Sequence, residues 1–424
     1  MLFVALPASA QDSSIYTQCP ESTELHPLIA GENGDPATRD PAIKCDHLAG
    51  GDGMVTMART MPDGVKKPLY VFGFSRVPMP GAPIPGTTLT APTADSGDYP
   101  GFVMEHGMLA ANIPAPTIVV DEDDELFLSM TNVGMTMRPD LFDPHTVHWH
   151  GFPQASSVFD GVPDASISVN MGATLTYYYN VQDAGTYMYH CHVEATEHMQ
   201  MGMLGNLYVR PKQNKLGYGA TPEAMDATVS RLGGNPESKF EGYAYNDGDG
   251  STGYDVEYPI QIGSFDPDFH DASLNVQPLP FAGMRDRYFL LNGRGYPDTA
   301  IEAGPQTDGR DSQPVSSYIE ATDGEQILLR ISNLNVTQFN TLGTNGPPMK
   351  VIALDARLLR DDDGNDMYYE TNSLTLGGGQ SADVIIDTTN LGGRTYFLYS
   401  TNLDYLANDA ENFGGMMTEI RISN

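Results

Sequence analysis

The sequence predicts an all-β protein built from two β-sandwich domains. Short apolar runs of about four to eight residues, rich in Val, Tyr, Phe and Thr, recur along the chain, and such runs are typical of strands. The 44 glycines and 31 prolines among 424 residues supply the turns between them. Long segments with a helical period are missing from the sequence, which disfavours folds in which helices cross over a parallel sheet.

The first set of predicted strands occupies residues 67–211. Its runs are PLYVFGF, PTIVV, ELFLSMTNV, LTYYYNV, GTYMYH and GNLYVRP. Their length and their spacing between turn residues suit a β-sandwich. A polar, Gly- and Asp-rich stretch follows at residues 212–254, which we interpret as a linker with one short helix near residues 221–232.

The second set of predicted strands occupies residues 255–424 and indicates a sandwich of similar size. Its runs are YPIQIGSF, RDRYFLLNG, QILLRISNL, MKVIALD, SADVIID, RTYFLYS and MTEIRIS. Two Gly-rich stretches here, NGRGYPD from Asn292 and GGGQSAD from Gly377, lack the patterns of dinucleotide- and phosphate-binding loops. We therefore interpret both as turns.

The start of the chain resembles the end of a signal peptide. Residues 2–6 are apolar, and residues 8–10 form a small-residue cleavage pattern, although a basic start is missing. Residues 1–10 are thus expected to be a signal-peptide remnant, and the protein to be periplasmic or extracellular. Residues 11–66 form an N-terminal extension, in which Cys19 and Cys45 are expected to form a disulfide. No apolar run in the sequence is long enough to span a bilayer.

The net charge of −33, from 55 acidic and 22 basic residues, indicates a surface that attracts cations. Such a chain repels DNA, RNA and anionic lipid, so nucleic-acid binding is disfavoured. The acidic runs DEDDE from Asp121, NDGDG from Asn246 and DDDGND from Asp361 do not complete the twelve-residue calcium-loop pattern. We expect them to be solvated loops.

Histidine is scarce, but six of the ten histidines fall within 54 residues, in two clusters. The first cluster is HTVHWHG, which begins at His145. Successive side chains of a strand point to opposite faces, so His148 and His150 share one face and His145 lies on the other.

The second cluster, YHCHVEATEHMQMGM, begins at Tyr189. The same alternation places His190 and His192 on one face and Cys191 on the opposite face. If the two strands are neighbours, the paired histidines form one site and Cys191 belongs to a second site directly behind it.

The thiol side predicts a blue-copper site. His145, Cys191, His198 and Met203 offer two imidazoles, a thiolate and a weak thioether, the ligand set of copper electron-transfer sites. Met199 and Met201 compete for the axial position. Zinc is the main rival metal, but zinc sites rarely recruit methionine.

The imidazole side predicts a second metal site. Four imidazoles without a thiolate suit copper, zinc or iron. They are His148, His150, His190 and His192. The covalent path from Cys191 to the histidines on either side of it would connect the two sites.

These motifs resemble a copper-binding cupredoxin domain of the multicopper oxidases. The resemblance is carried by HTVHWHGF, by VFDGVPDA and by GTYMYHCHVEATEHMQMGMLGNLYV, and it extends over about residues 70–211. The second half, with YFLLNGRGYPDT and SADVIID, resembles a cupredoxin domain without copper ligands. The resemblance implies two Greek-key cupredoxin-like sandwiches. It also implies a type 1 copper that accepts electrons and a type 2/type 3 copper cluster that reduces dioxygen to water.

The family's site residues match this chain position by position. The type 1 set corresponds to His145, Cys191, His198 and Met203, and half of the type 2/type 3 set corresponds to His148, His150, His190 and His192. Asp160 in FDGVP matches an acidic residue that delivers protons near the cluster, or it is a turn residue before Gly161.

The chain departs from the family pattern in two ways. The gap of seven residues from Cys191 to His198 is longer than the usual laccase loop. The family's cluster also needs eight histidines, and only four are found here in the expected motifs. The remaining histidines do not form HxH pairs; they are His26, His47, His106 and His270.

Three alternative arrangements would complete the second site. Two copies of the first domain could supply four histidines each, or a partner or a further domain could supply the four missing histidines. Alternatively, the face holds a single copper, with His270 from a neighbouring chain, as in copper nitrite reductase. A homo-oligomer is therefore expected.

The leading functional hypothesis is a multicopper oxidase that oxidises a small molecule, metal ion or redox protein one electron at a time and reduces dioxygen. The first alternative is a nitrite reductase-like enzyme with a mononuclear type 2 copper, and the second is a blue-copper electron carrier or copper-binding protein without catalysis. The acidic surface and nearby methionines suit Cu(I), Fe(II) or Mn(II) as reductant in place of a phenol, or these methionines only fill the core, so the sequence does not select a substrate. These methionines are Met104, Met108, Met199 and Met201.

Overall fold

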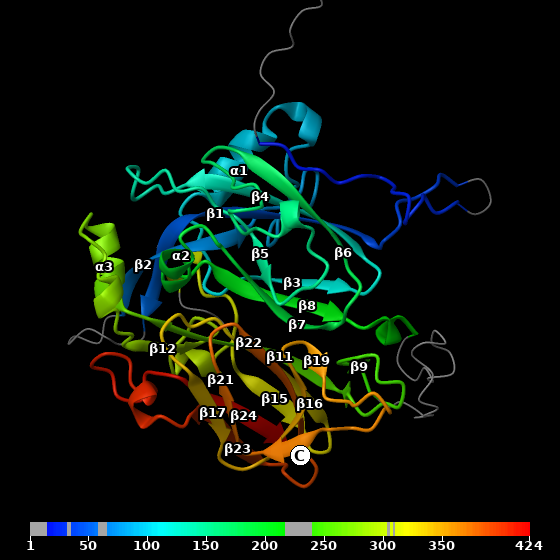
Figure 1. Ribbon diagram of the computed structural model, residues 1–424, viewed down its shortest axis with the longest axis vertical. Helices are drawn as coiled ribbons and strands as arrows, with labels where there is room; N and C mark the ends of the chain where they lie inside the picture. The colour runs from blue at the N-terminus through cyan, green and yellow to red at the C-terminus, as the bar shows by residue number, and fades with distance from the viewer. Residues whose placement is uncertain (1–14, 32–34, 58–65, 217–239, 303–305, 308–309) are drawn as a thin grey trace, which may run out of the picture.

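Two β-sandwiches, one above the other in Figure 1, form the protein. The computed structural model describes residues 15–31, 35–57, 66–216, 240–302, 306–307 and 310–424. Each sandwich encloses its own hydrophobic core. The predicted all-β fold of two sandwich domains is confirmed.

The first sandwich consists of two four-stranded sheets with the orders β2-β1-β4-β6 and β3-β8-β7-β5. Their strands are β1 (Ile43–Met57), β2 (Lys67–Arg76), β3 (Ala115–Asp121), β4 (Glu125–Gly134), β5 (His148–His150), β6 (Thr174–Asn180), β7 (Gly185–His190) and β8 (Leu204–Arg210). Buried aromatic residues such as Phe72, Trp149 and Tyr177 fill the space between the sheets. This packing holds β5 and β7 in place. β5 carries His148 and His150, and β7 ends at His190, directly before Cys191.

The second sandwich pairs a seven-stranded sheet with a five-stranded one. The first has the order β12-β11-β16-β22-β18-β19 with β20 paired to β18, and the second has the order β15-β24-β23-β17-β21. The strands are β11 (Val256–Phe265), β12 (Tyr288–Leu291), β15 (Ile319–Thr322), β16 (Gln326–Asn333), β17 (Asn340–Thr344), β18 (Met349–Leu354), β19 (Arg357–Leu358), β20 (Tyr369–Thr371), β21 (Ser373–Leu376), β22 (Gln380–Asp387), β23 (Arg394–Ser400) and β24 (Met417–Ser423). Its core is aliphatic, which suits strands that are rich in Ile, Leu and Val.

Short helices and two-residue strands connect these elements. They are α1 (Tyr99–Gly107), α2 (Ala195–Gln200), α3 (Pro267–Leu274), β9 (Gly242–Tyr243), β10 (Gly253–Tyr254), β13 (Gln306–Thr307) and β14 (Arg310–Asp311). None of the helices in the described part of the chain has the length and apolar character that a bilayer crossing requires.

The N-terminal segment differs from its predicted role as an extension. Residues 43–57 form β1, which lies between β2 and β4 within the first sandwich. The sequence pattern hides this strand because it buries glycine and a carboxylate instead of alternating apolar residues. A Cβ on Gly51 would lie 2.8 Å from Val133 Cγ2, and the buried Asp52 accepts hydrogen bonds from the Tyr70 hydroxyl and two backbone N–H groups. Cys45 on β1 forms the expected disulfide with Cys19.

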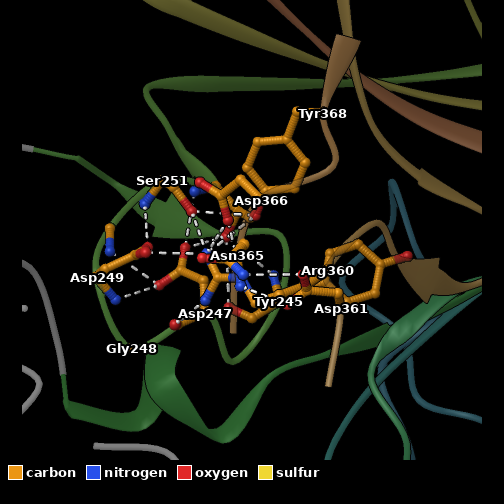
Figure 2. Close-up of polar contacts among 12 residues, drawn as sticks. Tyr245, Asp247, Gly248, Asp249, Ser251, Arg360, Asp361, Asn365, Asp366 and Tyr368 are labelled. Atoms are coloured by element: carbon orange, nitrogen blue, oxygen red, sulfur yellow. Dashed lines mark hydrogen bonds and ion pairs between the residues drawn. The ribbon is translucent and has the colours of Figure 1, made fainter. Parts of the chain in front are cut away.

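The described end of the predicted linker is folded against the second sandwich. Figure 2 shows its NDGDG turn and the DDDGND turn on either side of Arg360. The guanidinium donates to Asp249 and Asp366, and to the hydroxyl of Ser251. The acidic runs were predicted to be solvated loops. DDDGND is largely exposed, as predicted, but Asp247 of NDGDG and Glu122, Asp124 and Glu125 of DEDDE are buried, so the prediction is wrong for those two runs. The NDGDG and DDDGND turns are joined because Arg360 supplies the positive charge between them. The helix predicted near residues 221–232 lies outside the described residues.

The two sandwiches meet through β7 and β8 of the first domain and β11, β16 and β22 of the second. Arg330 on β16 is fully buried there and pairs with Glu257 and Asp383. Thr186 on β7 donates to Asp383 and accepts from Arg330. Because β7 ends at His190, this buried polar contact ties the second domain to the strand that leads into the predicted metal ligands.

Candidate metal centres

The two histidine clusters lie on neighbouring strands. β5 and β7 pair antiparallel, with His148 opposite His190 and Trp149 opposite Tyr189. Cys191 follows the last residue of β7. The two clusters are therefore neighbours, as predicted. The strand alternation places the Cys191 thiol on one side and the paired histidine rings on the other.

The thiol side brings together His145, Cys191 and His198, whose donor atoms lie within 4.8 Å of one another. The Cys191 Sγ is 3.1 Å from His198 Nδ1 and 3.9 Å from His145 Nδ1. All three side chains are completely buried. His145 is held by a backbone bridge to Val169, and His198 is carried by α2. Two imidazole nitrogens that face one thiol match the equatorial ligands of a type 1 copper.

Met203 lies beside this group, in the loop after α2. Its N–H donates to the His198 carbonyl (2.8 Å), and its own carbonyl accepts from Cys191 N–H (3.1 Å). A Cβ on Gly50 of β1 would lie 3.1 Å from His145 Cδ2 and 3.5 Å from Met203 Cε, so both side chains abut the same glycine. Met199 packs against a separate apolar cluster, whereas Met201 and Met203 both belong to the core of the first sandwich.

Electrostatics around Cys191 favour the thiolate. Burial raises the pKa of the Cys191 thiol, but attraction to His198 and hydrogen bonds from His145 and His198 together lower this pKa well below its usual value. Thr146 N–H also approaches the sulfur, at 3.5 Å. A thiolate is the form in which cysteine binds metals.

The imidazole side brings together His148, His150 and His190 within 4.8 Å, and the His192 ring lies 5.0 Å from that of His148. His148 Nδ1 donates to the Asp160 carbonyl (2.6 Å), and His190 Nδ1 donates to the Cys191 carbonyl (2.9 Å). Because a carbonyl only accepts, these contacts place the free lone pair of each neutral ring on Nε2.

Burial favours the neutral form of His148, His150 and His190. It lowers the pKa of His190 to about 3, and it is the main cause of the lowered pKa values of His148 and His150. Neutral imidazole is the metal-binding form of histidine. The chemistry of both donor sets therefore fits copper.

Gly379 in the second sandwich touches the imidazole side, although its sequence context predicts only a turn. It has φ +88°, and a Cβ there would lie 2.6 Å from His150 Nε2. The GGGQ turn thus leaves room for a ligand nitrogen of the other domain. Its Gly-rich composition was the only available signal, and such composition does not indicate what the turn contacts.

Asp160 and the remaining histidines occupy different surroundings. The Asp160 carboxylate is 3.6 Å from His148 Nδ1. His270 is fully buried, with its ring nitrogens 2.5 Å and 2.9 Å from the carbonyls of Tyr70 and Gln200. The hypothesis that His270 is a ligand to a neighbouring chain's copper is therefore wrong, because both nitrogens are engaged within its own chain. The other histidines contact Asp123, Tyr99 and Phe102; they are His26, His47 and His106.

Comparison with known proteins places the chain in a family. Family models described as multicopper oxidase match residues 103–214 and 273–419. Multicopper oxidase MCE of Talaromyces pinophilus is 34% identical over 115 residues, which cover 26% of this chain and 18% of that protein. L-ascorbate oxidase of Cucurbita maxima is 22% identical over 296 residues, which cover 67% of this chain and 43% of that protein. The matches thus span less than half of each of these curated relatives.

Solved structures show the same fold at low identity. A blue copper oxidase from Nitrosomonas europaea superposes with a TM-score of 0.58 at 20% identity, over 89% of this chain and 86% of that one. A copper nitrite reductase from the same organism has a TM-score of 0.52 at 14% identity, over 90% of this chain and 95% of that one. With the two family matches and the two copper-type donor sets, we conclude that the chain belongs to the multicopper oxidase family.

Proposed function

We propose that this protein takes single electrons from a reductant at the thiol side and passes them to dioxygen at the imidazole side. One observation carries the proposal: Cys191 belongs to both sides. Its thiol faces His145 and His198, while its carbonyl accepts a hydrogen bond from His190 Nδ1. Copper bound at the two sides would supply the one-electron cycling and the reduction of oxygen.

The residues of the chain support this chemistry in distinct ways. Complete burial of His145, Cys191 and His198 excludes water from the electron-accepting side. A short connection joins the two sides. It runs through the covalent bonds from Cys191 Sγ to the Cys191 carbonyl and then through the hydrogen bond to His190 Nδ1. The Asp160 carboxylate lies 3.6 Å from His148 Nδ1 and remains 32% exposed, so it is placed to carry protons from solvent to the imidazole side.

The imidazole side needs further ligands to hold a three-copper cluster. Its described residues supply four imidazoles, of which His148, His150 and His192 remain partly exposed. We propose that a second copy of the chain, or a further domain or partner, contributes the remaining ligands at this open side. The Cys19–Cys45 disulfide supports the related proposal that the protein works outside the cytoplasm, in the periplasm or beyond the cell.

The electron route is tested with Cys191→Ser. This variant should lose both the blue absorption of the copper-loaded protein and its oxygen uptake, because serine does not replace a thiolate ligand. Met199→Leu, a nearby change of similar volume within an apolar cluster, should retain both. Full oxygen uptake by Cys191→Ser would contradict the proposal.

Nitrite reduction is the second candidate function. The donor atoms of His148, His150 and His190 converge within 4.8 Å, as a mononuclear copper bound by three imidazoles would require. The anaerobically reduced, copper-loaded protein distinguishes the candidates. Reoxidation by nitrite alone would support nitrite reduction, reoxidation by oxygen alone would support the oxidase, and a reduced protein that is stable in air would indicate an electron carrier.

A further inference from the structure

A helix from the second half of the chain packs against the first sandwich. α3 lies between β11 and β12 in the sequence, but beside β2 and α2 in space (Figure 1). Phe269 on α3 belongs to the core of the first sandwich, and Arg138 after β4 donates to the carbonyl of Ser273 near the C-terminal end of the helix. The helix therefore brings side chains of the second half of the chain next to α2, which carries His198.

His270 on this helix connects two main-chain carbonyls of the first domain. Its side chain is fully buried, with Nδ1 2.5 Å from the carbonyl oxygen of Tyr70 on β2 and Nε2 2.9 Å from that of Gln200, the last residue of α2. Both oxygens only accept hydrogen bonds, whereas a neutral imidazole has a single N–H. Only the imidazolium donates to both carbonyls at once, so one of the two contacts depends on the charge of the ring.

Gln200 is held by the second domain at two points. Its side-chain amide donates to the buried Asp286 carboxylate at 3.1 Å, and its main-chain carbonyl faces His270 Nε2. Asp286 lies just before β12, and His270 lies on α3. The end of α2 is therefore gripped by two separate segments of a domain that supplies no copper ligand.

The gripped residue lies between two ligands of the thiol side. His198 Nδ1 faces the Cys191 sulfur at 3.1 Å, and the His198 carbonyl accepts from Met203 N–H at 2.8 Å. A change in the hold on Gln200 therefore reaches both the imidazole and the thioether. The properties of a type 1 copper depend on its axial ligand and on the surroundings of the sulfur, so this position bears on the copper site.

The surroundings of His270 favour the neutral ring at neutral pH. Burial lowers the pKa of His270; the two carbonyls and the carboxylates of Asp266 and Asp286 oppose this effect, but the pKa stays below its usual value. The ring therefore gains its second N–H only in acid. We assign the single proton of the neutral ring to Nδ1, because the contact to Tyr70 is the shorter one, so Nε2 then turns a lone pair towards Gln200.

Other titratable groups around α3 have partners of their own. Three of them bind a carboxylate: Lys67 binds Asp271, the Tyr70 hydroxyl binds Asp52, and Arg138 binds Asp140. The fourth is Glu197 on α2, whose pKa is raised to about 7 by burial. Glu197 is therefore the rival source of a pH effect at the thiol side.

We propose that His270 is a positioning residue through which the second domain sets the geometry of the type 1 copper site, and that protonation of the ring tightens its hold on Gln200 and α2. The inference rests on the proposed electron-accepting role of the thiol side and adds a regulation of it. In neutral solution the ring donates to β2 alone. In acid it donates to β2 and α2 together, so the copper site responds to pH through a domain without copper ligands.

Two substitutions separate the two halves of the ring. The amide nitrogen of asparagine reaches about as far as Nδ1, and that of glutamine about as far as Nε2. The blue absorption and the EPR spectrum of the oxidised, copper-loaded protein are recorded from about pH 8 to about pH 4.5. Copper holds the ligand imidazoles in this state, so they do not titrate. The unsubstituted protein should show a spectral transition below about pH 6.5.

Both substitutions should abolish this transition, but in opposite senses. His270→Gln should show the acid spectrum at every pH, because its amide donates to the Gln200 carbonyl permanently. His270→Asn should show the neutral spectrum at every pH, because its amide does not reach α2. Ser273→Ala on the same helix is the control: it removes a buried hydroxyl that has no hydrogen-bond partner among the described residues, and it should keep the transition.

Three results would overturn the inference. They are a transition that persists in both His270 variants, which would assign the effect to Glu197; a spectrum of the unsubstituted protein that does not change with pH; and a copper-loaded protein without a blue band. Either His270 variant decides alone if the other does not fold. Oxygen uptake is read separately: the predicted spectra without oxygen uptake would support the role of His270 and contradict only the oxidase proposal.

Discussion

Gly379 of the second sandwich abuts the His150 ring of the first, so that a Cβ at Gly379 would lie 2.6 Å from Nε2. The contact joins residues that are 229 positions apart in the sequence (379 − 150). A domain without its own HxH pairs therefore still limits where one of the four imidazoles can lie.

Gly379→Ala should displace His150 and lower oxygen uptake while the blue absorption of the thiol side remains. The added methyl collides with a ligand nitrogen, and the position also has φ +88°, which costs about 1 kcal/mol for alanine. Gly324→Ala is the matched control, because it has φ +94° and no described atom within 4 Å of the added Cβ. Equal loss of oxygen uptake in both variants would attribute the effect to backbone strain instead of the contact.

Copper content and mass in solution should show how the imidazole side is completed. About two and a half coppers per chain in an even-numbered oligomer corresponds to one type 1 copper each and a shared three-copper cluster. We expect this value if two copies face each other. About two coppers per chain would favour the mononuclear alternative, and about one would leave only the thiol side and contradict the oxidase proposal.

Stability should fall in mild acid because of His47 on β1. Burial lowers the pKa of His47 to about 4, and its ring is held by Tyr99 and Thr131. The unfolded chain binds the proton near pH 6.5, so the stabilisation is complete above that pH and is lost as the pH falls towards 4. The loss attributable to this residue is about 3 kcal/mol.

The pH dependence is measured as the free energy of unfolding of the metal-free protein between pH 7 and pH 4. His47→Gln should be less stable at pH 7 but should show a shallower decline with acid. An unchanged slope in this variant would assign the acid sensitivity to other groups.

Arg360→Gln should destabilise the second domain by about 2 kcal/mol, because charged hydrogen bonds to Asp249 and Asp366 are lost and the two carboxylates then repel each other (Figure 2). The measurement is thermal unfolding of the copper-free protein. Arg421→Gln is the control, since Arg421 is an exposed surface arginine paired with Glu419 and should change stability little. Equal effects of both substitutions would contradict a special role for Arg360.

Much of the fold follows from local patterns, and the exceptions have physical causes. The strands around the metal ligands are apolar or aromatic and were predicted with their two-sandwich arrangement. β1 was missed because glycines and the buried Asp52 replace the usual alternation, and these residues are stable there only through contacts with Val133, Tyr70 and the backbone. The contact between the NDGDG and DDDGND turns was not predicted because their sequences do not show that Arg360 lies between them.

The sequence by itself determined which donor atoms each side of the metal region offers, because the alternation of side chains along a strand is a local property of the backbone. For this reason, the sequence alone placed the Cys191 thiol on the opposite face from the His190 and His192 rings. Only the tertiary structure decided which distant groups meet those donors: Glu194 and Asp143 beside His198, and Gly379 against His150. These contacts depend on how loops and whole domains pack, and packing is set by the summed interactions of many residues instead of by the spacing within one motif.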